Sequence, residues 1–228
     1  MNDTITEINK DTFWRLIWEA KDACGQDMSA MVWYLKGRLV SMGAEQAQNF
    51  HDITQAYEDL AYKYGLWDAA EIITEYGCSD DGFIDFRAWL IAQGKEVYLA
   101  ALADPDSLVE VEPYGDCSFE QMSYVGEYAY KQLTGKSAYE QTDQRKYKKL
   151  VAELKQDITY KDGIQFPREG AELKQFLPRL CAKHPDRWRE PHWNLDLKVV
   201  RELFYAGKVH DHQQVCKKAN RGHGGEAR

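Results

Sequence analysis

The sequence predicts an all-α fold, a multi-helix bundle with short, glycine-terminated connections and few or no strands. Apolar side chains recur three and four residues apart through most of the chain, which is the period of a helix with one buried face. A glycine follows the last apolar residue of several of these stripes, where helices commonly end in a left-handed conformation. No stretch alternates apolar and polar residues for long, and residues 163–166, ahead of Pro167, are the best candidate for an extended piece.

Four helices are expected in the first third of the chain. The first begins behind Asp11 or Thr12 as its N-cap. The four expected helices span residues 12–24, 28–42, 50–64 and 66–73, closed by Gly25, Gly43, Gly65 and Gly77. Connections this short imply antiparallel neighbours, as in a bundle.

Capping residues place the next three helices. Ser79 is suited to N-cap one helix, and Ser118 with Gln121 forms the pattern of a capping box for another. The helices expected from these signals run from Ser79 to near Gly94, over residues 95–103 ahead of Asp104-Pro105, and from Ser118 to Leu133 ahead of Gly135.

The carboxy-terminal third continues the helical pattern. A helix is expected from Glu169 onward, kinked or ended by Pro178, and another over residues 194–206. The expected parts of the chain are an acidic amino-terminal bundle (1–112), carboxy-terminal helices packed on it in the same domain (113–183), a His-rich helical extension (184–221) and a disordered tail (222–228).

The charge of the chain is unevenly distributed. The net charge is −8, but residues 1–115 carry 8 Lys and Arg against 21 Asp and Glu, and residues 116–228 carry 21 against 16. An acidic surface favours a basic partner and repels nucleic acid, although it also serves solubility alone. The chain shows neither a signal-peptide pattern nor a bilayer-length apolar run, so we expect a cytoplasmic protein without membrane contact.

The acidic turn at residues 79–82, Ser-Asp-Asp-Gly, suggests a metal site. As a calcium loop it fails, because aligning Gly82 with the sixth position puts Gly77 and Ala88 where acidic ligands are needed. Asp80, Asp81 and Asp85 could instead hold a divalent metal beside Arg87, as in a metal-dependent hydrolase. The competing interpretation is structural, since the first turn of a helix favours acidic side chains without any metal.

Two further groups of residues suggest chemistry. Cys78, at a helix start, could carry a thiol of lowered pKa. A zinc site would draw on residues with short spacings near the carboxy terminus, namely Cys181, His184, His210, His212 and Cys216. The competing interpretation is that these are surface histidines and reduced, structural cysteines.

Basic and aromatic clusters suggest two kinds of binding. Residues 145–149 carry four Lys and Arg around Tyr147 and could contact a phosphate backbone, or could form the solvated face of a helix. Trp14, Trp18 and Tyr62 lie off the apolar stripes and could form an exposed patch suited to a protein partner.

Three motifs carry a family resemblance. They are FWRLI at residues 13–17, WDAA at 67–70 leading to GCSDDGFIDFRAWLI at 77–91, and ALADPDSL at 101–108. Together they resemble the bacterial family catalogued as domain of unknown function 4240, over residues 10–135 and more weakly to about residue 180. Because that family has no assigned function, the resemblance implies membership and no particular activity.

We therefore expect a non-enzymatic protein-binding module whose acidic, aromatic surface engages a basic protein, in bacterial conflict or regulation, as neutralising immunity proteins do. The candidate binding residues are Trp14, Trp18, Asp80, Asp81, Asp85, Arg87 and Trp89. No cofactor is expected. The alternatives are the metal-dependent hydrolase, with zinc or another divalent ion, and a nucleic-acid-associated protein.

Overall fold

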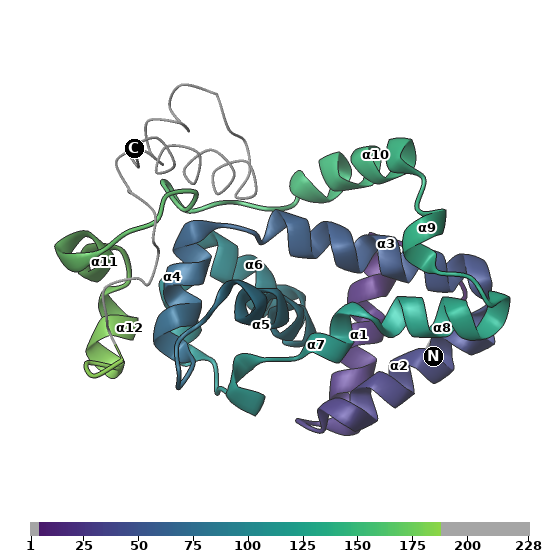
Figure 1. Ribbon diagram of the computed structural model, residues 1–228, viewed down its shortest axis with the longest axis horizontal. Helices are drawn as coiled ribbons and strands as arrows, with labels where there is room; N and C mark the ends of the chain where they lie inside the picture. The colour runs from purple at the N-terminus through teal and green to yellow at the C-terminus, as the bar shows by residue number, and fades with distance from the viewer. Residues whose placement is uncertain (1–4, 188–228) are drawn as a thin grey trace, which may run out of the picture.

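The computed structural model describes residues 5–187, and the regular secondary structure of this part of the chain is entirely helical (Figure 1). Its helices are α1 (Lys10–Cys24), α2 (Met28–Met42), α3 (Ala44–Leu60), α4 (Tyr64–Ile73), α5 (Asp80–Ala92), α6 (Lys95–Ala103), η1 (Pro105–Glu110), η2 (Gly115–Cys117), α7 (Glu120–Ser123), α8 (Val125–Thr134), α9 (Ala138–Gln141), α10 (Gln144–Lys155), α11 (Gly170–Phe176) and α12 (Pro178–Lys183). No β-strand occurs among the described residues, which confirms the all-α prediction. The expected extended piece at 163–166 is wrong, because these residues form hydrogen-bonded turns.

Local signals fix most of the ends of α1 and α2. Gly25 and Gly43 end these helices with positive φ angles of 61° and 97°, as predicted. The start of α1 differs from the prediction, because the N-cap is Asn9. The Asn9 side chain accepts from the N–H of Thr12 at 3.1 Å, and the Thr12 hydroxyl accepts from the N–H of Asn9 at 2.8 Å, so a reciprocal capping box begins the helix earlier.

The end of α3 does not depend on a glycine. Gly65, the predicted stop, lies inside α4, and its N–H donates to the carbonyl of Ile164 at 2.7 Å. The carbonyls near the end of α3 accept from side chains that are distant in sequence. These bonds are Tyr98 Oη to Tyr57 O (2.6 Å), Arg87 Nη1 to Glu58 O (2.8 Å) and Tyr160 Oη to Leu60 O (3.0 Å). Side chains that are distant in sequence therefore bond the carbonyls at the end of α3, where the last carbonyls of a helix need partners.

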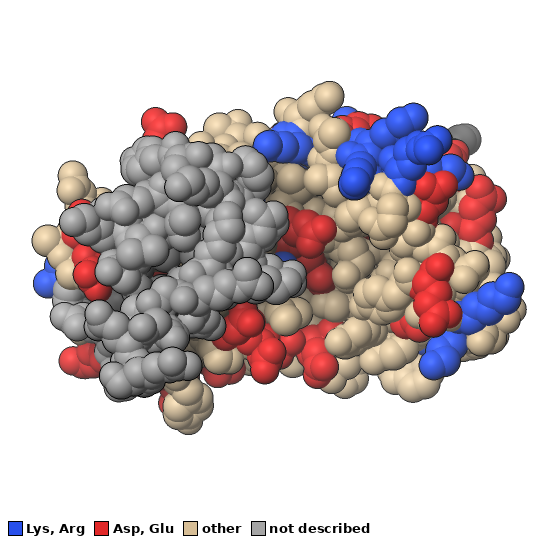
Figure 2. Space-filling view, turned by 45° about the horizontal axis from the view of Figure 1, so that its top comes forward, with Lys and Arg blue, Asp and Glu red and all other residues tan. Residues whose placement is uncertain are grey.

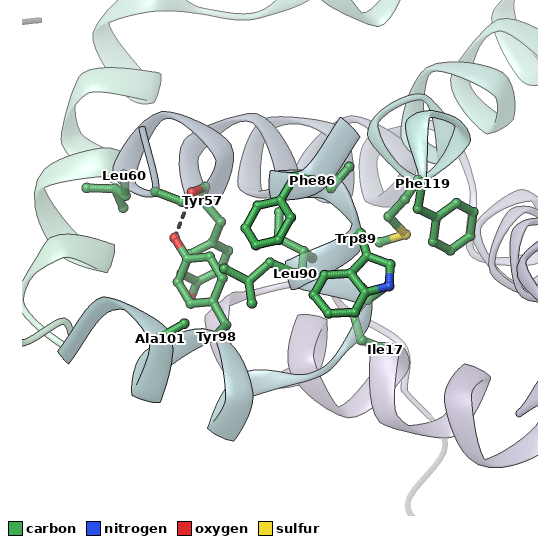
Figure 3. Packing of buried hydrophobic residues seen from close by; sticks show 14 of the residues in the cluster. Ile17, Tyr57, Leu60, Phe86, Trp89, Leu90, Tyr98, Ala101 and Phe119 are labelled. Carbon is green, nitrogen blue, oxygen red and sulfur yellow. Dashed lines mark hydrogen bonds between the residues drawn. The ribbon is translucent and has the colours of Figure 1, made fainter. Parts of the chain in front are cut away.

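Helix α5 forms the centre of the core. Figure 3 shows Phe86, Trp89 and Leu90 of α5 among side chains from α1, α3 and α6, with Phe119 beside them. Trp89 and Leu90 are fully buried, and so are most residues from Phe83 to Ala92. A helix that is apolar on nearly all sides belongs in the interior of a protein.

The chain after residue 132 packs against the same core. Figure 1 shows α10 along α3, and α11 and α12 beside α4. The buried cluster includes Leu154, Ile164, Leu173 and Leu177 together with the residues of α1 to α8. The carboxy-terminal helices therefore cover surfaces that α3 and α4 would otherwise expose.

Asp106 positions the last described helix. Pro178 is the first residue of α12, so the prediction that it interrupts the helix is confirmed. The buried carboxylate of Asp106 accepts from the backbone N–H groups of Arg179 and Leu180 at 3.0 and 2.9 Å and from Arg179 Nε at 3.1 Å. This side chain satisfies free N–H groups at the start of α12.

The predicted capping box at Ser118 is wrong. Phe119 occupies the N-cap position of α7, and the Ser118 hydroxyl donates instead to the carboxylate of Asp85 at 3.2 Å. The expected continuous helix to Leu133 is divided at Tyr124 into α7 and α8, and α8 ends at Gly135 as predicted.

Candidate protein-binding surface

The acidic turn begins α5 in the manner of a structural cap. The Ser79 hydroxyl accepts from the N–H of Gly82 at 3.1 Å, which confirms Ser79 as the N-cap. Asp80 accepts from the hydroxyl of Tyr62 at 2.9 Å, and Asp81 is exposed in the first turn. Both acids lie where they interact favourably with the helix dipole.

Asp85 connects this turn to α7. Its carboxylate accepts from Ser118, and its backbone carbonyl accepts from the N–H of Phe119 at 3.2 Å. Burial raises the pKa of Asp85, the hydrogen bond from Ser118 opposes that rise, and the nearby charges of Glu120 and Asp81 add to it. Asp81, Asp85 and Glu120 therefore share one acidic edge.

Arg87 does not face this edge. It is 5% exposed, and its guanidinium donates to the carbonyls of Phe83 (3.1 Å) and Glu58 (2.8 Å). Its charge also lies 4.4 Å from the ring centre of Tyr62, a favourable cation–π contact. Burial lowers the pKa of Arg87. Arg87 therefore points into the interior of the protein and not toward Asp81 and Asp85.

The three predicted tryptophans differ in exposure. Trp18 is 62% exposed, as expected for a surface aromatic. Trp89 is fully buried. Trp14 is only 5% exposed, and its indole N–H donates to the hydroxyl of Tyr57 at 2.9 Å. The expectation that Trp14 is exposed is wrong, because the ring of Tyr98 on α6 packs 5.4 Å away and covers this side of α1.

The predicted metal ligands do not gather in the described chain. Within residues 5–187, no group of three or more His, Cys, Asp and Glu side chains is arranged to hold a metal ion. Of the predicted zinc ligands, Cys181 and His184 are half-buried, and burial lowers the pKa of His184. The others, His210, His212 and Cys216, lie outside the described residues.

Cys78 has a structural position. Its N–H donates to the carboxylate of Glu71 at 2.6 Å, and its carbonyl accepts from the indole of Trp67 at 2.7 Å. Burial raises the pKa of the Cys78 thiol, whereas a reactive cysteine needs a lowered one. The expectation of a lowered pKa is therefore wrong.

A groove that the sequence did not reveal lies between α2 and α8. We call it the α2–α8 groove; its volume is about 250 Å³, and it is lined by Met28, Ser29, Val32, Trp33, Lys36, Gln121 and Tyr128. Trp33 is 70% exposed, and Tyr128 is 39% exposed. The Lys36 ammonium lies 5.3 Å from the centre of the Trp33 ring. The one sequence signal was that Trp33 falls off the stripe formed by Met31, Leu35 and Leu39.

Exposed acids adjoin this groove, and we call them the acidic rim. Asp27 precedes Met28, and Glu120 precedes Gln121. Asp116 follows Gly115, whose Cα lies so close to the Met28 side chain that an added Cβ would meet it at 2.6 Å. Through Glu120, the rim continues to Asp85 and Asp81.

The turn that carries Asp116 is strained. Gly115, Asp116 and Cys117 have φ angles of 57°, 51° and 54°, a left-handed conformation that is unfavourable for residues other than glycine. The Asp116 side chain accepts from the N–H of Glu75 at 2.8 Å. This bond and the burial of Cys117 hold the turn in place.

The basic cluster of residues 145–149 lies on α10. Figure 2 shows Lys and Arg side chains gathered over this helix, and Arg145, Lys146, Lys148 and Lys149 are all exposed. Tyr147 faces α3 and donates to the carboxylate of Asp59 at 2.7 Å. The cluster is thus the solvated face of a helix packed on α3.

None of the helices between residues 5 and 187 has both the length and the apolar character that crossing a bilayer requires.

Comparison with known proteins gives one family. No curated protein and no solved structure matches the chain. The family model described as "Protein of unknown function (DUF4240)" matches residues 8–132, which is more than half of the sequence and contains α1 to α7 and most of α8. The chain therefore belongs to the DUF4240 family.

Proposed function

We propose that this protein is a non-enzymatic binding module whose α2–α8 groove and acidic rim take up a basic, amphipathic segment of another protein. The observation that carries this proposal is the exposure of Trp33, at 70%, in a groove beside the exposed acids Asp27, Asp116 and Glu120. Neutralisation or regulation of that basic partner is the role we propose.

The chemistry of the groove supports a protein ligand. Trp, Tyr and Met are enriched in the centres of protein interfaces, and charged residues surround them at the rim. A groove of about 250 Å³ suits one or two apolar side chains. The acidic rim would contribute mainly to the association rate and to the choice of partner, because rim charges are only partly desolvated.

The strained turn at 115–117 gives further support. Left-handed non-glycine residues persist only where the surrounding structure fixes them, and they are concentrated at ligand-binding sites. Here the strained turn lies against the groove, because Gly115, next to Asp116, is in close contact with the Met28 side chain.

The buried titratable groups favour binding over catalysis. Catalytic groups with shifted pKa values lie in clefts that a substrate can reach. Glu58 and Asp68, whose pKa values burial raises, are 5% and 3% exposed, and neither lines the α2–α8 groove.

A peptide pair tests the proposal. We expect an amphipathic peptide of about 18 residues of Leu and Lys to bind at least about tenfold more tightly than the same peptide with Glu in place of Lys. Added salt should weaken the binding of the Lys peptide. Isothermal titration calorimetry measures both affinities.

Matched variants locate the site. Trp33→Ala and Glu120→Lys should each weaken binding, whereas Trp18→Ala and Glu45→Lys, which change the same residue types outside the groove, should not. Equal affinity for the two peptides, or an equal loss with Trp18→Ala and Trp33→Ala, would refute the proposal. In a pull-down from native lysate, a genuine partner is retained at low salt, released at high salt, and lost with Trp33→Ala.

The exposed cations of α10 support a second candidate, binding of nucleic acid (Figure 2). It predicts retention of duplex DNA that falls steeply with salt and is lost when Lys148 and Lys149 are changed to Glu. Retention that these changes leave unaltered would exclude α10 as the contact.

A further inference from the structure

We infer that a second cleft, between α1 and the start of α6, binds a small planar organic anion, an aromatic ring that carries a carboxylate or a phosphate. This cleft, the α1–α6 pocket, has a volume of about 480 Å³ and shares no residue with the α2–α8 groove. Pockets for small molecules typically measure about 300–1,000 Å³. The inference is independent of the proposed protein-binding function.

Lys21 supplies the charge for an anion. It lines the pocket and is half-buried, and its ammonium donates to the backbone carbonyl of Gln93 at 2.9 Å and to its side-chain oxygen at 3.4 Å. Among the described residues, no carboxylate lies within 4.0 Å of this ammonium. The Lys21 ammonium has three N–H donors, and its charge is partly desolvated in this pocket. A bound anion would accept a hydrogen bond from it and balance its charge.

Gln93 holds Lys21 in position. Its side-chain N–H group donates to the carbonyl of Trp89 at 3.1 Å and to the hydroxyl of Tyr114 at 2.9 Å. Gln93 is itself 6% exposed. The acceptor that orients the ammonium is therefore fixed by the core, as the supporting residues of a binding site usually are.

The other charges that line the pocket balance one another, so Lys21 leaves an excess of one positive charge. Arg15 and Lys95 also line it, together with the acids Asp22 and Glu96. Lys95 reaches Asp11 only at 3.9 Å. An ion pair this loose and exposed is weak, so the Lys95 ammonium can turn toward a bound anion.

The first turn of α6 adds backbone donors to the pocket. Gly94 and Lys95 line the cleft, Gly94 is the N-cap with a φ of 102°, and no side chain caps the N–H groups of this nine-residue helix. Free N–H groups and the positive end of the helix dipole favour an anion at this point. They add to the attraction that the Lys21 ammonium exerts on an anion.

Trp18 supplies an aromatic wall. It is 62% exposed and lies three residues before Lys21 on α1, so the two side chains share one face of the helix. A flat ring stacked on the indole would cover this exposed apolar surface while its acidic group meets the ammonium. The combination selects a planar anion over an inorganic ion or a neutral ring.

Benzoate and phenyl phosphate are the probes, with benzyl alcohol as the neutral control. Binding is followed by the side-chain indole N–H signals of the protein in ¹H–¹⁵N spectra. We expect saturable shifts of the Trp18 signal with either anion, little shift of the Trp33 signal, and weak or no response to benzyl alcohol.

Variants then test the residues. Lys21→Gln and Trp18→Ala should each weaken anion binding at least about tenfold, while Lys36→Gln and Trp33→Ala, the same residue types in the other groove, should leave it unchanged. Arg15→Gln, at an exposed position, serves as a second charge variant if Lys21→Gln lowers stability. The inference is overturned if neither anion binds, if benzyl alcohol binds equally well, or if the pocket variants bind as the wild type does.

Discussion

Glu58→Gln should change how the stability of the protein depends on pH. Glu58 lies on α3 and is 5% exposed; its carboxyl group accepts from the Ser123 hydroxyl at 2.5 Å and from the Gln55 amide at 3.2 Å. Burial raises the pKa of Glu58 to about 7, although the hydrogen bond from Ser123 and the charge of Arg87 oppose this rise. Glutamine has nearly the same size and keeps an acceptor for Ser123, but it cannot ionise.

The size of the effect follows from the shift in pKa. The ordinary value is 4.5 and the folded value is about 7, and a difference of about 2.5 units corresponds to about 3 kcal/mol. The pKa of Glu58 is higher in the folded protein than in the unfolded chain, so the resulting stabilisation is complete below the pKa of the unfolded chain. It is lost as the pH rises through the pKa of the folded protein. Relative to the variant, the wild type should therefore lose up to about 3 kcal/mol of unfolding free energy between about pH 4.5 and about pH 8.

Urea unfolding at constant ionic strength, from about pH 5 to about pH 8, measures this difference. Comparing wild type with variant at each pH removes the contributions of other groups, such as His51, whose pKa burial lowers. The matched control is Glu45→Gln, an exposed change on the same helix, which should alter stability by less than about 0.5 kcal/mol.

The reasoning is refuted if the stability difference between wild type and Glu58→Gln stays constant across this pH range. A constant difference would mean that Glu58 does not change its protonation state in the folded protein near neutral pH.

Three further substitutions test packing, helix propensity and capping. Gly126→Ala should destabilise the protein by about 1–3 kcal/mol, because an added Cβ would lie 2.7 Å from the backbone of His51. Gly37 lies in the middle of α2, where an added Cβ meets nothing within 4 Å, so Gly37→Ala should stabilise the protein by about 0.5–1 kcal/mol. Midpoint temperatures of thermal unfolding that shift in the same direction for Gly126→Ala and Gly37→Ala would contradict this. Asp106→Asn should lower the free energy of unfolding by about 1–3 kcal/mol. Both carboxylate oxygens of Asp106 accept from backbone N–H groups at the start of α12, whereas an amide has only one acceptor oxygen. Hydrogen exchange at the amide of Leu180 should quicken, and unchanged exchange there would count against the role of Asp106.

The sequence predicted helices well where the signals are local. Residues 95–103 form α6 as expected, because glycine precedes them and Asp104-Pro105 follows. Gly25, Gly43 and Gly135 end helices for the same reason. Each of these boundaries depends on backbone conformations that neighbouring residues determine.

Boundaries that depend on distant residues were missed. Nothing local shows that Tyr160 bonds the carbonyl of Leu60, so the local pattern predicts that Gly65 ends α3. The capping box at Ser118 failed because Asp85, 33 residues earlier, takes its hydroxyl. Tertiary contacts override local capping preferences in such cases.

The same limit applies to the candidate sites. Trp18 could be predicted to be exposed, but Trp14 could not be predicted to be buried, because its covering residue Tyr98 lies on another helix. The acidic turn was visible in sequence, whereas the α2–α8 groove combines residues of α2, α7 and α8. A groove between helices has no sequence pattern until the packing of those helices is known.

The way α3 ends has a consequence for the evolution of this family. The match to the family model stops at residue 132, yet Tyr160 and Ile164 complete the hydrogen bonding of Leu60 and Gly65, which lie well inside it. A relative that shared only the matched segment would have to supply other partners for these backbone groups, since leaving them buried and unpaired is costly. The matched segment thus lacks residues that pair with backbone groups inside it, and substitutions near the end of α3 should be constrained by a stretch of chain about a hundred residues away.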